Sequence, residues 1–129
     1  MLHASLQDLP VTLEDDELFA LAAYTYDHGA GQDGNIYFEL NKRLRSRKTL
    51  DRNVMFAIWG GFLYYLLNGL AKLPDDQAVV YRGYPDKAKT LAQYKVGRPI
   101  QWGAFSSASL DPEVTKQFTS KADGVIFKL

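Results

Sequence analysis

One arginine and two serines are the residues of this sequence whose types and spacing could do chemistry. Arg82 follows the apolar run AVVY, and Gly83 comes directly after it. Ser107 and Ser109 lie in a later segment that we predict to be a strand, so both hydroxyls would share one face, with Ala108 on the other. A guanidinium is a rigid fork of donors that matches phosphate, and glycine lets a ligand approach the backbone. The pattern indicates a phosphate-containing ligand, although arginine and serine on strands are as often a structural pair.

A glycine-rich stretch from Gly29 to Gly34 matches the dinucleotide-binding pattern G-x-G-x-x-G. That pattern requires a strand before the glycines and a helix that opens on them. Here the apolar spacing predicts a helix before the stretch, so we interpret it as a flexible loop. A parallel sheet containing the loop would instead favour a dinucleotide-dependent oxidoreductase.

Composition argues against several other classes of function. The 129 residues include 15 basic and 15 acidic side chains, so no net charge attracts the chain to nucleic acid or to an acidic membrane. Five of the seven residues from Lys42 to Lys48 are basic, which we interpret as a solvated helix face rather than a nucleic-acid site. The absence of cysteine excludes disulfides, thiolate catalysis and iron–sulfur clusters. Two histidines without cysteine also make us expect no metal site.

The elements that must position these residues can be predicted from periodicity and from turn signals. Apolar residues at helical spacing predict three helices, over residues 13–24, 35–48 and 53–73. After a Pro-Asp-Asp turn the sequence changes to short apolar runs that are typical of strands. We predict strands within residues 78–83, 99–110 and 124–129. Asp111-Pro112 is an N-cap followed by a first-turn proline, which predicts a short helix through Phe118. We therefore expect one α+β domain over residues 1–129, with a helical part over 13–73 and a β-rich part over 78–129.

The third predicted helix is apolar enough that a membrane span has to be considered. It carries no charge from Asn53 to Ala71. Gly60, Gly61 and Asn68 contribute little apolar transfer energy. We therefore predict a buried core helix and no membrane span. Phe62→Asp should then unfold the protein, because it would bury an unpaired charge.

The N-terminus, MLHASLQDLP, has neither the basic nor the apolar region of a signal peptide. With no cysteine to oxidise, we expect a cytosolic protein, a cytosol-directed (secreted) effector, or a domain of something longer.

Several short motifs, taken in order, resemble a known family. The VYRG of residues 80–83 and the FSSASL of residues 105–110 resemble the arginine strand and the serine-x-serine strand of arginine-specific mono-ADP-ribosyltransferases, the arginine-serine-glutamate class. Upstream, the Y-T at residues 24–25 and the Y-x-x-L-N-x-x-L-R at residues 37–45 are similar to the helical signature of toxin-like and vertebrate-like members. The aromatic stretch within residues 64–74 is similar to the segment that precedes the arginine strand in this family.

The resemblance implies a fold, an activity and roles for residues. The fold is a split β-sheet core that binds NAD in a cleft, bordered by an N-terminal helical subdomain. The whole enzyme transfers ADP-ribose from NAD to a protein acceptor, most often arginine, and releases nicotinamide. By this likeness Arg82 holds a phosphate, the Gly83 backbone binds the carboxamide, and Ser107 positions the ribose and a catalytic glutamate. Ser109 belongs to the same cofactor-binding set.

The second predicted helix supplies two more expected NAD-binding residues, Tyr37 and Asn41. With Arg45 they are spaced four apart and form a polar stripe beside the apolar line that contains Leu40. Such a helix suits one wall of a ligand cleft, and ordinary surface polarity would explain the same spacing.

The sequence also departs from the family pattern. Ala108 stands where threonine or serine is common, and the catalytic E-x-E or Q-x-E motif is absent from these 129 residues. Glu113, Glu39 and Glu17 do not match it. We therefore expect a C-terminally truncated part that, on its own, binds NAD weakly and transfers ADP-ribose negligibly. We expect its last strand to pair with a C-terminal fragment or second chain.

Three alternatives stay open at this point: a non-catalytic NAD-binding module, a dinucleotide-dependent oxidoreductase that uses the glycine loop, and a helical membrane or nucleic-acid protein.

Overall fold

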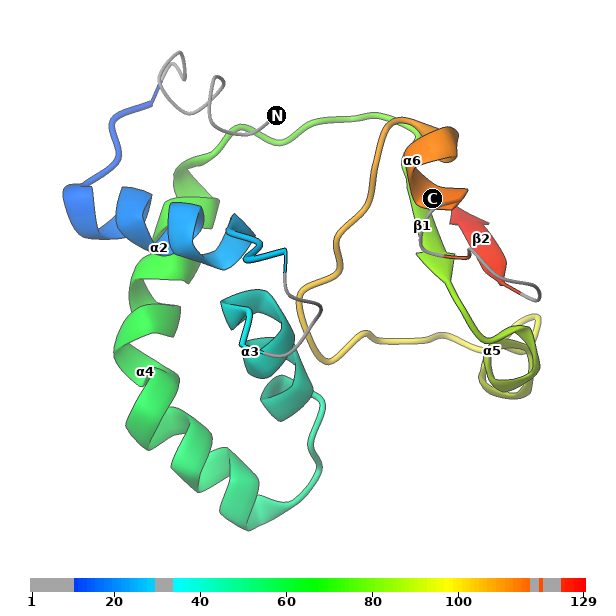
Figure 1. Cartoon of the computed structure of the whole chain (residues 1–129), viewed down its shortest axis with the longest axis horizontal. Helices are drawn as coiled ribbons and strands as arrows, with labels where there is room; N and C mark the ends of the chain where they lie inside the picture. Colours follow the sequence, from blue (N-terminus) through cyan, green and yellow to red (C-terminus); the bar gives the residue numbers. More distant parts are fainter. Residues whose placement is uncertain (1–10, 30–33, 117–118, 120–123) are drawn as a thin grey trace. The chain divides into compact units, whose positions relative to one another are not determined.

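The computed structural model describes residues 11–29, 34–116, 119 and 124–129. The chain divides into two compact units, residues 1–75 and residues 76–129. The first unit holds helices and the second holds a two-stranded antiparallel sheet with short helices (Figure 1). The α+β class expected from the sequence is confirmed.

The first unit is built from helices α2 (Asp15–Thr25), α3 (Ile36–Leu44) and α4 (Thr49–Lys72) (Figure 1). All three pack against one another. Their buried apolar side chains form its core: Ala20 and Leu21 from α2, Leu40 from α3, and Met55, Leu63 and Leu66 from α4. The three predicted helices are present, although α3 ends earlier than expected and α4 begins at Thr49.

The start of α2 and the end of α4 are held together by charge and by close packing. The backbone N–H of Glu14 donates to the Glu17 carboxylate at 3.0 Å, and the Lys72 ammonium donates to the same carboxylate at 2.8 Å. A Cβ built on Gly69 would lie 3.2 Å from Leu21 Cδ1, so the absence of a side chain there lets the two helices approach. The hydrogen bond from Lys72, aided by the Glu14 N–H, lowers the pKa of Glu17.

Helix α4 buries one face and exposes the other, which corrects the expectation of a buried helix. Met55, Leu63, Leu66 and Gly69 are buried. Phe56 and Ile58 are each 65% exposed, and Phe62 is only half-buried. The expectation failed because apolar residues occur all round this helix, whereas α2 and α3 cover only one side of it. By length and composition alone α4 could cross a membrane, since its mean hydropathy is 1.5, but one such helix is weak evidence for a span.

The second unit is centred on strands β1 (Tyr81–Tyr84) and β2 (Val125–Lys128), which pair antiparallel with Arg82 opposite Phe127 (Figure 1). Backbone hydrogen bonds between Val80 and Leu129 extend the ladder by one residue pair. On the other edge of β1, Tyr81 exchanges both backbone hydrogen bonds with Ser109. The strands predicted within 78–83 and 124–129 are therefore present.

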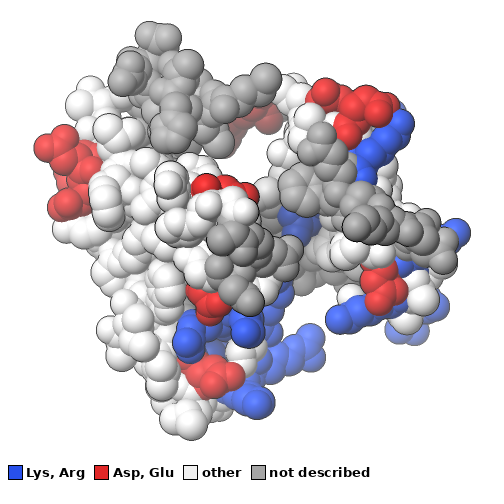
Figure 2. All heavy atoms as spheres, viewed as in Figure 1, with Lys and Arg blue, Asp and Glu red and all other residues white. Residues whose placement is uncertain are grey.

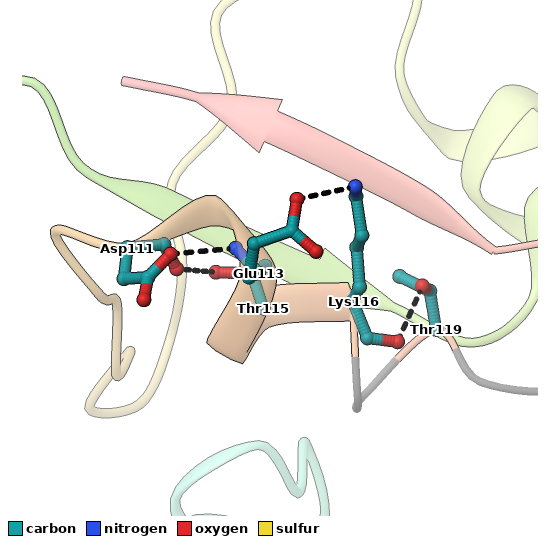
Figure 3. A network of polar contacts seen from close by, with 5 residues as sticks. All are labelled: Asp111, Glu113, Thr115, Lys116 and Thr119. Atoms are coloured by element: carbon teal, nitrogen blue, oxygen red, sulfur yellow. Dashed lines mark hydrogen bonds and ion pairs between the residues drawn. The ribbon is translucent and has the colours of Figure 1, made fainter.

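Two short helices flank this sheet. Helix α6 (Pro112–Lys116) packs against β1 and begins as predicted, because the Asp111 carboxylate accepts from the N–H of Glu113 at 2.8 Å (Figure 3). The expected continuation of this helix to Phe118 lies outside the described residues. Helix α5 (Lys87–Gln93) was not predicted, although Asp86 is an N-cap that accepts from the N–H of Lys89 at 2.9 Å.

The strand predicted within residues 99–110 is wrong except at its end. Only Ser109 in this segment makes a ladder contact, and residues 100–108 have no regular secondary structure. Pro99 has no N–H to donate to a ladder, and Gly103 weakens a strand interior. The segment is held by side-chain contacts instead, such as the 2.7 Å hydrogen bond from the Trp102 indole N–H to the Tyr94 hydroxyl.

Candidate functional site

Four of the six residues expected to bind the cofactor come together on one edge of β1. In the antiparallel ladder, backbone groups point alternately to the two neighbours of a strand. Val80 pairs with Leu129 towards β2, and Tyr81 pairs with Ser109 on the opposite edge. By this alternation the N–H and C=O of Gly83 also face the edge on which Ser109 lies. Gly83 is thus at the position where the segment containing Ser107 leaves the ladder.

The Arg82 side chain connects β1 to that segment. Its Nη1 donates a 2.6 Å hydrogen bond to the backbone carbonyl of Ser107. The guanidinium carbon lies 5.1 Å from the centroid of the Tyr84 ring and 5.4 Å from that of Trp102. The Arg82 Nε is buried and has no hydrogen-bond partner in the described part of the chain. A buried donor without a partner is unusual in folded proteins.

An aromatic cluster lies beside this arginine. Phe127, its cross-strand neighbour, has its ring centroid 5.6 Å from Tyr84, 4.7 Å from Tyr94 and 6.4 Å from Trp102. Burial, reinforced by a hydrogen bond with Tyr84, raises the pKa of Tyr94, so its phenol ionises less readily than that of a free tyrosine. The Tyr84 and Trp102 rings therefore lie beside Arg82 without adding a negative charge. Sequence reasoning missed it, because its members are far apart in the chain and share no motif.

The two serines are placed differently. Ser107 is exposed, and its carbonyl is the acceptor for Arg82. Ser109 is half-buried, and its hydroxyl accepts a 3.1 Å hydrogen bond from the N–H of Asp111, in the turn that leads to α6. A hydroxyl that accepts one hydrogen bond still has its own proton to donate. The strand alternation used to align the two hydroxyls does not apply, because residue 107 is not in a strand.

Gly83 also has a packing role that the sequence did not suggest. A Cβ built on it would lie 2.8 Å from the carbonyl oxygen of Thr115 and 3.2 Å from the methyl carbon of the same residue. The side of Gly83 where a side chain would stand is therefore occupied by α6. Glycine lets α6 rest on β1 at this point, independently of any ligand that the backbone of Gly83 binds.

Tyr37 and Asn41 lie in the first unit, in a network of polar side chains that links α3 to α2. The amide of Asn41 donates to the Tyr24 hydroxyl at 2.9 Å, and the Asn35 amide donates to the Tyr37 hydroxyl at 3.3 Å. Asn35 is fully buried and accepts from the N–H of His28 at 2.9 Å. Burial is the main cause of a raised Tyr37 pKa. The polar groups of both side chains are thus already hydrogen-bonded within the first unit, and that of Asn41 joins α3 to α2.

A shallow apolar hollow of about 320 Å³ lies in the same unit, along α2 and the start of α3. It is lined by Phe19, Ala22, Ala23, Tyr26, His28 and Ile36. Such a lining suits an apolar group rather than a phosphate. Among the residues that the structure describes, no group of three or more His, Cys, Asp or Glu side chains is arranged to hold a metal ion.

Comparison with known families bears on this geometry. The sequence model of the NAD:arginine ADP-ribosyltransferase family matches residues 3–129. The chain belongs to this family. Comparisons with individual curated proteins and with solved structures gave no significant match. As a member of the ADP-ribosyltransferase family, the chain is assigned to transferases that use NAD as their substrate and modify an acceptor.

For an ADP-ribosyltransferase the position of glutamates matters, because a carboxylate can stabilise the cationic sugar that forms when nicotinamide leaves. Glu113, the glutamate nearest to the serine segment in sequence, is bound by the Lys116 ammonium at 2.6 Å on α6 (Figure 3). Glu17 is buried and paired with Lys72 in the first unit. Both carboxylates therefore have structural partners.

Proposed function

We propose that this chain is the NAD-binding part of a mono-ADP-ribosyltransferase that transfers ADP-ribose from NAD to a protein arginine and releases nicotinamide. The observation that carries the proposal is the convergence of Arg82, the Gly83 backbone and Ser107 on one edge of β1. The Nη1 and Nη2 donors of this guanidinium, beside the exposed Ser107, suit a phosphate-linked sugar.

Each of these residues has a distinct role in the proposed mechanism. Arg82 binds the phosphate next to the nicotinamide ribose. The Gly83 backbone binds the carboxamide, and Ser107 and Ser109 position the ribose. With NAD held at these points, the bond between the ribose C1′ and the nicotinamide nitrogen breaks, and its electron pair leaves with nicotinamide. A nitrogen of the acceptor guanidinium then attacks C1′ and loses a proton.

Tyr37 and Asn41 of the first unit are the other two residues that the proposal assigns to NAD binding. Their hydrogen bonds with Asn35 and Tyr24 hold the two side chains in place. Residues 13–73 then form the helical part and residues 78–129 the β-rich part of one ADP-ribosyltransferase domain with a split sheet.

The catalytic glutamate is the group that these residues do not supply. The 129 residues contain no E-x-E or Q-x-E motif, so we propose that the glutamate comes from a further segment or a second chain that adds to the sheet beside β2. The same observation favours a second candidate function, a non-catalytic NAD-binding module. The two differ in one measurement: adding a segment with the E-x-E motif, in cis or in trans, restores transfer only if the first is correct.

Calorimetry of NAD binding to an Arg82→Lys variant tests the role of the arginine. Lysine keeps the charge but cannot make a bidentate contact with the phosphate. We therefore expect NAD binding to weaken by about 2–4 kcal/mol, which is roughly 30- to 1,000-fold. Arg98→Lys is the matched control, because Arg98 is an exposed arginine of the same unit. Unchanged NAD affinity in Arg82→Lys would remove the arginine from the site.

A further inference from the structure

We propose that Tyr84 and Trp102 are positioning residues that hold the Arg82 guanidinium in the orientation in which it binds phosphate, with Tyr94 fixing Trp102. This inference rests on the proposed function of Arg82 and extends it to residues outside the arginine and serine motifs.

The register of the sheet places the rings where they can do this. Arg82 and Tyr84 are two residues apart on β1, so their side chains lie on the same face, and Phe127 opposite Arg82 shares that face. The guanidinium lies close to the Tyr84 and Trp102 rings, at 5.1 and 5.4 Å. At these distances the negative face of a ring attracts the cation without forming a salt bridge that a phosphate would have to break.

Trp102 needs an anchor, because it lies in a segment without regular secondary structure. Its indole N–H donates to the Tyr94 hydroxyl at 2.7 Å, and the Tyr94 ring packs 4.7 Å from Phe127 on β2. Tyr94 caps the C-terminus of α5. The short helix that follows β1 thus returns the chain to the sheet and carries the residue that orients Trp102.

These contacts limit which edge of the guanidinium a ligand can reach. The Nε is buried, and Nη1 is bonded to the carbonyl of Ser107. The Nη2 group has no hydrogen bond to a described residue, so we infer that phosphate binds there and at the second proton of Nη1. Free arginine side chains sample many rotamers, and holding one of them before the ligand arrives raises affinity.

The first test needs no ligand. In a nitrogen-15 NMR spectrum of the full chain, the Nε–H signal of Arg82 can be assigned by its loss in Arg82→Lys. We expect the neighbouring rings to shift this signal away from the chemical shift of a free arginine. Trp102→Leu fills the space without a ring, whereas Trp102→Phe restores one. We expect the signal to move towards that of a free arginine in the leucine variant and to stay displaced in the phenylalanine variant. Tyr64→Ala, which removes a 64% exposed ring in the first unit, is the control and should change nothing.

The second test measures NAD affinity by calorimetry. We expect Trp102→Leu to weaken NAD binding about tenfold, the scale of a desolvated cation–π contact, and Trp102→Phe to recover most of it. In an Arg82→Ala background the tryptophan variants should have no further effect, because they act through the arginine.

The inference is overturned if leucine and phenylalanine at position 102 behave alike in both measurements, since Trp102 would then only fill space. If the Nε–H signal responds as expected but Arg82→Lys binds NAD normally, the proposed function of Arg82 fails, and the role of the rings in phosphate binding fails with it.

Discussion

Gly83→Ala should destabilise the second unit even without NAD, because the added methyl group has no room. The new Cβ would lie 2.8 Å from the Thr115 carbonyl oxygen. Ordinary contact begins near 3.4 Å, so α6 or β1 has to move by 0.6 Å, the difference between the two distances. The nearest atom is backbone, and no side-chain rotation relieves the contact.

The expected cost follows from that displacement. Forcing an extra methyl into a packed contact costs roughly 1–3 kcal/mol, and the lower entropy of the unfolded alanine chain offsets about 0.4–1 kcal/mol of it. We therefore expect a net loss of about 1–2 kcal/mol in the free energy of unfolding. A serine at position 115 removes the neighbouring methyl but not the carbonyl, so Thr115→Ser should not restore stability to Gly83→Ala.

Urea unfolding measures this effect. The chain has two tryptophans, and in a Trp59→Phe background the fluorescence of Trp102 reports on the second unit alone. Gly61→Ala is the matched control: Gly61 lies in α4 with nothing within 4 Å of a built Cβ, so alanine should stabilise the helix by about 0.5–1 kcal/mol. A Gly83→Ala protein as stable as its parent would refute the packing argument and leave ligand binding as the only role of this glycine.

Three further predictions concern the two faces of α4, the buried carboxylate and the serines. Leu66→Asp should unfold the first unit because Leu66 is 1% exposed, whereas Ile58→Asp on the exposed face should change the thermal midpoint little; equal effects would mean that α4 is covered on both sides. Because the pKa of Glu17 is lowered, its stabilising effect is present above the ordinary glutamate pKa and is lost as pH falls through the lowered value. Glu17→Gln should therefore make the free energy of unfolding depend less steeply on pH in the acid range. An unchanged pH dependence would contradict this. Ser107→Ala should weaken NAD binding more than Ser109→Ala, which should mainly destabilise the turn before α6; the reverse order in calorimetry would exchange their roles.

The sequence alone was sufficient for the features that depend on local signals. The N-cap at Asp111 and the alternating residues of β2 specify α6 and β2 through backbone hydrogen bonding within a few residues. The family was recognisable for a related reason, since its motifs at residues 80–83 and 105–110 are short and contiguous. Helix α5 was within reach of the same reasoning, because Asp86 is an N-cap of the same kind.

Only the tertiary structure decided which residues meet. The rings beside Arg82 come from β1, from the end of α5, from an irregular segment and from β2, and nothing in their local sequence marks them as neighbours. The irregular path of residues 100–108 and the exposed face of α4 were misjudged for the same physical reason. An apolar pattern records that a residue can be buried, but burial also requires another element to cover it. That element is determined by long-range packing, which propensity and periodicity do not contain.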